Sequence, residues 1–192
     1  MYTNAGKITI SNKQSMIKNT AIKSRSSFFF VMSLVGLLAV CVGFAKTFII
    51  PVAAGSFKAP FSIHLHGAFA FGWVILFVIQ TSLIRIKNYH LHIKLGILGV
   101  FMALGTAITM LPAGVFQVKN EGLGPTAIST IVGVCTSAVI FLSLAVAGII
   151  CRKKAAAHKR LMLLATIEVL WVAWWRFGIT FRQFLMQRCG LV

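Results

Sequence analysis

The stretch TAISTIVGVCTSAVIFLSLAVAGII, residues 126–150, decides the fold class of this chain. It contains no charged residue and no proline. A helix rises about 1.5 Å per residue, so a run of this length is sufficient to cross the roughly 30 Å hydrocarbon core of a bilayer. The run therefore predicts a transmembrane helix.

Four further apolar runs of similar length flank this one. A polar, basic segment precedes them at residues 1–27, and a short tail follows them at residues 186–192. We predict an all-α membrane protein, a five-span transmembrane helical bundle that occupies residues 28–185. The predicted spans are residues 28–50, 62–84, 95–117, 126–150 and 161–185.

The composition points to the same class. Of the 192 residues, 58% are hydrophobic and only 11% are charged, whereas a soluble domain is about a quarter charged. The mean hydropathy is +0.91. The net charge of +17 would suggest nucleic acid as the partner of a soluble chain, but no basic stripe with interleaved aromatic residues is present. We expect the lipid bilayer as the partner and no nucleic acid.

The positions of the basic residues predict the orientation. Five lie in residues 1–27, three in residues 85–94 and five in residues 152–160, whereas the alternate connections carry only Lys58 and Lys119. Lys and Arg are enriched in cytoplasmic connections. The bundle is therefore predicted to have its N-terminus inside the cell and its C-terminus outside.

The histidines form two His-x-His pairs, His64 with His66 and His90 with His92, and His158 stands apart. One four-histidine metal site is excluded because about twenty residues of helix, or roughly 30 Å, separate the two pairs. Residues two apart on a helix point in nearly opposite directions, so one member of each pair faces the bundle. We predict that these members are His66 and His92.

On the inner side, His92 and His158 open the third and fifth spans in matching motifs, HIKLGIL (92–98) and HKRLMLL (158–164). If these helices are neighbours, the two imidazoles could bind the iron of a haem b from opposite sides, an arrangement that suits one-electron transfer. Nearby Arg and Lys could bind the propionates. The alternative is that each histidine caps its loop and ligates nothing.

On the outer side, His66 is accompanied by several cationic and aromatic residues. These could form a pocket for haem propionates, a quinone head group or an anionic substrate. The alternative is an aromatic belt with arginines that extend toward the membrane surface. The accompanying residues are Lys46, Arg176, Arg182, Trp171, Trp174 and Trp175, with Trp73 on the same helical face as His66.

Two polar residues are predicted inside the membrane. Glu168 lies ten residues beyond His158, or about 15 Å deeper, where ionisable residues are rare and commonly functional. It is expected to be protonated or bonded to Thr106 or Thr109, and a proton-relay role is a hypothesis. Gln80, in the second span, is expected to form a hydrogen bond between helices. With only two acidic residues in the chain, hydrolysis and phosphoryl transfer are not expected.

Three stretches of the chain carry a resemblance. They are IHLHGAFAFGWVILFVIQTSLI (63–84), HLHIKLGILG (90–99) and AAHKRLMLLAT (156–166), with Arg176 downstream. Together they resemble an uncharacterised family of bacterial multi-pass inner-membrane proteins. The resemblance covers about residues 43–180 and implies a location in the bacterial cytoplasmic (inner) membrane, but no activity. A likeness to membrane b-type cytochromes is one of architecture only.

The sequence is compatible with three functions. The first is a haem-b-binding electron-transfer protein, with His92 and His158 as iron ligands. The second is a module that binds or transports a small anion or a lipid-like molecule through His66, Arg176 and the tryptophans. The third is a membrane assembly protein with structural histidines. Because the fifth span ends close to the C-terminus, we expect either a longer chain or a partner, in a homo- or hetero-oligomer, to complete the bundle.

Overall fold

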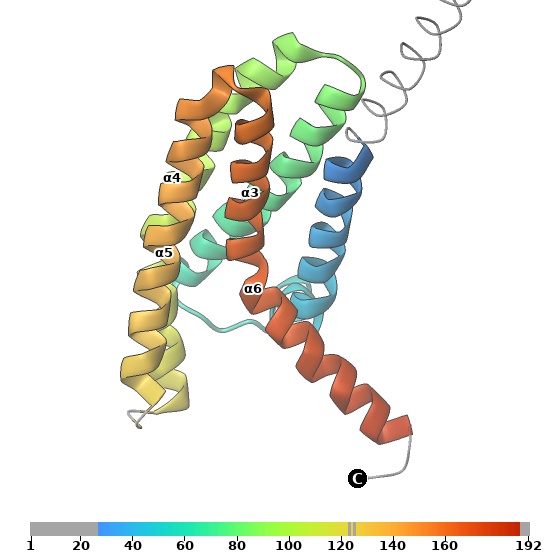
Figure 1. The fold of residues 1–192 in the computed structure, drawn as a ribbon. Helices are drawn as coiled ribbons and strands as arrows, with labels where there is room; N and C mark the ends of the chain where they lie inside the picture. The colour runs from blue at the N-terminus through green and yellow to red at the C-terminus, as the bar shows by residue number, and fades with distance from the viewer. Residues whose placement is uncertain (1–26, 123, 125, 189–192) are drawn as a thin grey trace, which may run out of the picture.

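The computed structural model describes residues 27–122, 124 and 126–188, and every regular element in them is a helix (Figure 1). The first helix, Ser27–Ala53, ends in a π-helical turn, η1 (Ala45–Ile49), and a last α-helical turn, α2 (Ile50–Ala53). The long helices that follow are α3 (Phe61–Arg85), α4 (Tyr89–Glu121), α5 (Thr126–Ile150) and α6 (Ala155–Arg188), with a 3₁₀ turn, η2 (Cys151–Lys153), before α6.

Four helices are long and apolar enough to cross a membrane. They are Ser27–Ala53, α3, α4 and α5, and each has at least 25 residues. The all-α class and these four apolar helices agree with the sequence prediction. The helix α6 is not among the four, so the fifth span stays a prediction, as does the orientation. Most of the segment 1–27 and of the tail 186–192 lies outside the described residues.

Local chemistry sets the ends of α3 and α4. Pro60, which fixes its own φ, directly precedes α3. In the tight turn after α3, Lys87 adopts a φ of 62°, and the Asn88 side chain then accepts a hydrogen bond from the amide of Leu91 at 3.2 Å, which caps α4. Gly122, with a φ of 91°, ends α4 in a backbone conformation that favours glycine.

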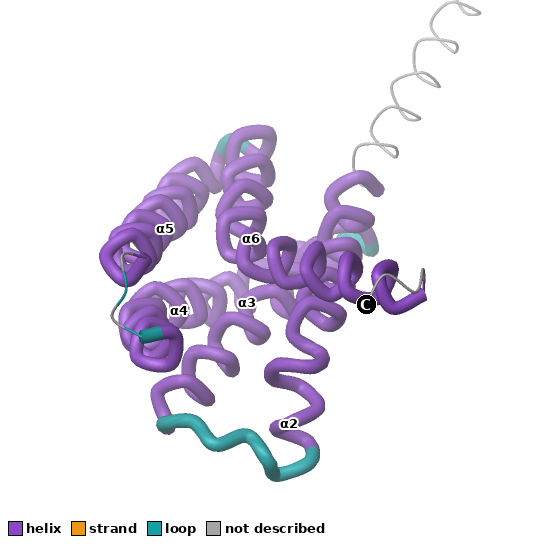
Figure 2. The backbone as a smooth tube through the Cα atoms, turned by 90° about the horizontal axis from the view of Figure 1, so that it is seen from below, coloured by secondary structure: helices purple, strands orange, loops and turns teal. Residues whose placement is uncertain are grey.

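The long helices form two hairpins, α3 with α4 and α5 with α6, joined by packing between α4 and α5. Seen from below, the four helices surround a common centre, and the first helix stands beside α3 and α6 (Figure 2). The α3–α4 turn and the α5–α6 turn lie at one end of the bundle. In the described part of the chain, no Cα atoms of α4 and α6 come within 8 Å of each other, so only side chains bridge these two helices.

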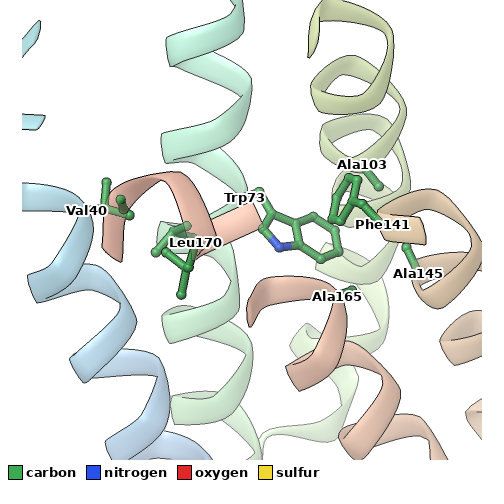
Figure 3. Packing of buried hydrophobic residues seen from close by; sticks show 9 residues of the cluster. Val40, Trp73, Ala103, Phe141, Ala145, Ala165 and Leu170 are labelled. Carbon is green, nitrogen blue, oxygen red and sulfur yellow. The ribbon is translucent and has the colours of Figure 1, made fainter. Parts of the chain in front are cut away.

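Trp73 of α3 occupies the centre of the core (Figure 3). Its ring packs edge-on against Phe141 of α5, with centroids 5.1 Å apart, and its indole N–H donates to the hydroxyl of Thr166 on α6 at 3.2 Å. The surrounding buried residues come from all five long helices and are mostly small: Val40, Val74, Ala103, Ala145, Ala165, Leu170 and Ala173. Trp73 therefore packs in the hydrophobic core, whereas the sequence analysis grouped it with the residues of the predicted outer pocket.

The first helix approaches α6 at two glycines. A Cβ atom on Gly36 would lie 2.8 Å from a methyl group of Leu170, and one on Gly43 would lie 2.6 Å from the backbone oxygen of Ala173. Beyond this crossing, the C-terminal half of α6 diverges from α5 and extends away from the other helices (Figure 1). The two hairpins are therefore closely associated at the end that carries their turns.

Candidate functional site

His92 and His158 lie next to each other at the end of the bundle that carries the helix turns. Each is the fourth residue of its helix, since α4 begins at Tyr89 and α6 at Ala155. The centroids of the two imidazole rings are 6.3 Å apart, and the ring planes are nearly perpendicular, at 84°. The sequence expectation that these two helix starts bring two imidazoles together is therefore met.

The imidazole of His158 is oriented by the backbone of the preceding helix. Its Nδ1 lies 2.7 Å from the carbonyl oxygen of Gly148 on α5. A carbonyl oxygen can only accept a hydrogen bond, so Nδ1 carries the proton and donates it. In the neutral ring, the lone pair is then on Nε2. Histidines that bind metals commonly have this arrangement, with one ring nitrogen donating to a carbonyl or carboxylate and the other free to ligate.

Gly148 is a site residue that the sequence did not reveal. It is buried where α5 meets α6, and a Cβ atom there would lie 2.8 Å from the sulfur of Met162. Only a residue without a side chain fits this approach without displacing Met162. The close approach in turn brings the Gly148 carbonyl within reach of His158. An acceptor on the backbone has no residue-type signature, so no motif pointed to it.

Two polar side-chain atoms at this site are buried and have no hydrogen-bond partner among the described residues. They are Nδ1 of His92 itself and Oε1 of Gln80. The Gln80 amide nitrogen donates to the backbone oxygen of His92 at 3.2 Å, which ties α3 to α4 as expected. A buried polar group left unpaired costs about 1–3 kcal/mol. Such atoms therefore mark a place where a further group, such as a metal or a water molecule, would be stabilising.

The surroundings of the histidine pair are basic. The turn between α3 and α4 carries Arg85 and Lys87. The turn between α5 and α6 and the start of α6 carry the basic run 152–154 with Lys159 and Arg160. Two of these cations reach the start of the first helix: Arg85 lies over the ring of Phe30 at 4.9 Å, and Lys159 over the ring of Phe29 at 5.1 Å. The remaining positive charges at this end are suited to an anionic group.

The other His-x-His pair lies far from this site. His66 is half-buried, and its Nδ1 lies 3.0 Å from the hydroxyl of Thr109 on α4. That hydroxyl donates to the Gly105 carbonyl at 2.6 Å, so it accepts a hydrogen bond from the N–H of His66. His66 and Gln80 are fourteen residues apart on α3, or about 21 Å by helical rise. Among the described residues, no three His, Cys, Asp or Glu side chains form a metal-binding group.

In both pairs, the histidine predicted to face the bundle does so. His66 binds α4, whereas His64 packs against the ring of Phe57 near the end of the first helix, with centroids 5.2 Å apart. His92 is half-buried against His158, whereas His90 is exposed. Helical periodicity allows only one member of each pair to face the bundle. The residues on the same helical face selected His66, and the motif match to His158 selected His92.

The residues of the predicted outer pocket do not share one set of contacts, in contrast to the histidine pair. The guanidinium of Arg176 lies over the ring of Phe44 at 5.2 Å. The space beside Gly67 is filled by the ring of Phe48, which leaves no room there for a Cβ atom. Four of the other residues predicted for this pocket, Trp171, Trp174, Lys46 and Arg182, are exposed, and the side chain of Trp175 lies outside the described residues.

Glu168 is half-buried on α6 and makes no hydrogen bond or ion pair with any described residue. Of the two expectations for Glu168, the hydrogen bond to Thr106 or Thr109 is not formed, and protonation stays a prediction. The Thr106 hydroxyl donates to the Met102 carbonyl at 2.8 Å, and the Thr109 hydroxyl donates to Gly105 of the same helix. Each threonine thus uses its one hydroxyl proton within its own helix, so neither hydroxyl donates to Glu168.

Comparisons with models of protein families, with curated proteins and with solved structures give no match to this chain. The geometry of the two histidine groups is therefore the basis for a functional assignment.

Proposed function

We propose that this protein is a small haem-b protein of the bacterial cytoplasmic membrane, in which His92 and His158 bind the iron for one-electron transfer. The observation that carries the proposal is the 6.3 Å separation of the two rings. A metal bound between two imidazoles forms two metal–nitrogen bonds of about 2.0–2.1 Å each. When the distance from each nitrogen to its ring centre is added, the expected separation of the two ring centres is roughly 6 Å.

Four features of the surroundings support this assignment. The proton of His158 is held on Nδ1 by Gly148, which leaves Nε2 for ligation. Nδ1 of His92 is buried and has no partner in the described part of the chain. The backbones of α4 and α6 stay more than 8 Å apart, so a flat group could lie between them. The basic residues of the two turns could hold its propionates by charge-assisted hydrogen bonds.

The chemistry follows from the ligands. A haem held by His92 and His158 would supply one-electron transfer when bound. The contribution of the chain is to orient both rings and to exclude water. His158 is oriented through Gly148, and His92 is held by the hydrogen bond from Gln80 to its backbone oxygen.

The proposed topology has five spans, an N-terminus in the cytoplasm and a C-terminus outside. It is supported by the location of both basic turns at one end of the bundle, which is also the end where the first helix begins. In this topology the haem site lies near the cytoplasmic face. A reporter enzyme that is active only outside the cytoplasm, fused after residue 192, should be active. An inactive reporter together with an active one fused after Lys87 would contradict this orientation.

The haem assignment is tested by spectroscopy of the protein purified in detergent from haem-replete cells. We expect a Soret band and a reduced-minus-oxidised α-band. His92→Ala and His158→Ala should each abolish the α-band, because each removes one of the two residues that would hold the iron. The matched controls are His90→Ala and His64→Ala, which should retain it, since His90 is exposed and His64 lies at the other end. A protein without a Soret band, or bands that persist in both ligand variants, would refute the assignment.

A further inference from the structure

Glu168 is the only acidic residue in the apolar part of the helices, and the described part of the chain gives it no partner. If α6 crosses the membrane, as proposed above, Glu168 lies about 15 Å beyond His158 by helical rise, well inside the hydrocarbon. Ionisable side chains at this depth usually face a bundle interior or pair with another group. Glu168 is only half-buried and has no hydrogen-bond or ion-pair partner among the described residues, so its surroundings are incomplete.

The side chain borders an exposed face of α6. The residues that pack into the bundle, Ala165, Thr166, Leu170 and Ala173, lie on the other side of the helix. The exposed face carries Leu164, Ile167, Trp171 and Trp174, each with more than two-fifths of its surface accessible. The outer half of the same helix diverges from α5 (Figure 1). An acidic group therefore sits at the edge of a broad apolar and aromatic helix face.

A second copy of this chain does not supply the missing charge. Lys46 and Arg176 are the cations inside the apolar runs apart from Arg182, which lies six residues further along α6 than Arg176. Arg176 lies eight residues beyond Glu168, or about 12 Å nearer the outer surface by helical rise. Lys46 lies at a similar outer level, since Gly43 is in contact with Ala173. Copies inserted in the same orientation place these groups at the same depths, so neither cation meets the Glu168 of a neighbour.

We propose that the exposed face of α6 binds a transmembrane helix of a different protein, one that carries a single basic residue at the middle of the membrane. The basic side chain pairs with the Glu168 carboxylate, and the partner packs along Leu164, Ile167 and Trp171. The charge complementarity sets both the depth and the identity of the partner, because an unpaired cation at mid-membrane is as unfavourable as the unpaired acid.

The test uses a defined probe in proteoliposomes. Synthetic polyleucine transmembrane peptides with a central Lys, a central Leu or a central Glu are labelled with an acceptor fluorophore, and the purified full-length protein with a donor. Energy transfer should report at least ten-fold stronger association of the Lys peptide than of the Leu peptide. The Glu peptide should associate no better than the Leu peptide. These comparisons use the unaltered protein and do not depend on a variant that folds.

The variant Glu168→Gln should reduce binding of the Lys peptide to the level of the Leu peptide, whereas Glu121→Gln, which alters the acid at the outer end of α4, should not. Equal association of the Lys and Leu peptides would overturn the proposal. It would also be overturned by undiminished Lys-peptide binding to folded Glu168→Gln protein, or by self-association of the protein that depends on Glu168. The C-terminal reporter described above shows separately whether α6 spans the membrane, and the haem spectrum does not depend on this face.

Discussion

Gly43→Ala offers the sharpest test of how the first helix packs on α6. The added methyl group would lie 2.6 Å from the Ala173 carbonyl oxygen and 3.3 Å from its carbonyl carbon and Cα. All three are backbone atoms, so no side-chain rotation relieves the contact. To restore an ordinary separation of 3.4 Å from the oxygen, the two helices must move apart by about 0.8 Å at this crossing, which loosens the packing around it.

Overpacking of this kind costs about 1–3 kcal/mol. Replacing Gly by Ala inside a helix also brings a gain of up to about 1 kcal/mol in helix propensity, which would obscure the effect in a single variant. Gly133→Ala in α5 is the matched control, because a Cβ atom there has no neighbour within 4 Å. The difference between the two variants isolates the steric term, and we expect Gly43→Ala to be less stable than Gly133→Ala by about 1–3 kcal/mol.

The assay is unfolding in mixed micelles with an increasing fraction of sodium dodecyl sulfate, followed by circular dichroism and tryptophan fluorescence. Gly43→Ala should unfold at a clearly lower fraction of the denaturing detergent than Gly133→Ala. If both variants unfold at the same point, the first helix does not cross α6 at Gly43, and the packing described above is refuted.

Two further substitutions test the histidine contacts. Thr109→Val keeps the shape of the side chain but removes the acceptor of the His66 hydrogen bond; it should destabilise the protein by about 0.6–2 kcal/mol in the same assay. Thr106→Val should cost less, because that hydroxyl bonds only within its own helix, and the reverse order would contradict the His66 contact. Gly148→Ala displaces Met162 and moves the carbonyl that orients His158. It should shift or weaken the α-band, whereas Gly96→Ala, with no neighbour within 4 Å, should leave the spectrum unchanged.

Hydropathy predicted the helices well where their ends coincide with a change of polarity. The run 126–150 is identical in its bounds to α5, because Gly122, Gly124 and Pro125 precede it and a basic cluster follows it. For α4 and α6, the predicted starts at residues 95 and 161 are each six residues late. Both helices begin in polar sequence, where Asn88 caps α4 before the apolar run starts. Apolar length identifies the part of a helix that lies in lipid, not where the helix itself begins.

The candidate site was predictable where it depends on helical periodicity. That rule limits each pair to one inward-facing member and, with Trp73 on the same helical face, selected His66. The matching motifs selected His92 and placed it and His158 at equivalent helix positions. The rule could not reveal Gly148, which acts through its backbone carbonyl. A separate depth estimate from helical rise offered Thr106 or Thr109 as partners of Glu168, but neither bond forms, because both hydroxyls donate to carbonyls of their own helix.

The placement of the two imidazoles on different hairpins has a consequence for biogenesis. His92 emerges from the ribosome sixty-six residues before His158, which at about 5–20 residues per second is an interval of roughly 3–13 s. During that time the first hairpin is already in the translocon or the bilayer with an unpaired Nδ1 on His92. The proposed site is completed only when α6 is inserted, so a chain that stops before α6 would lack the second proposed ligand. Occupancy of the site would thus distinguish chains that contain α6 from chains that do not.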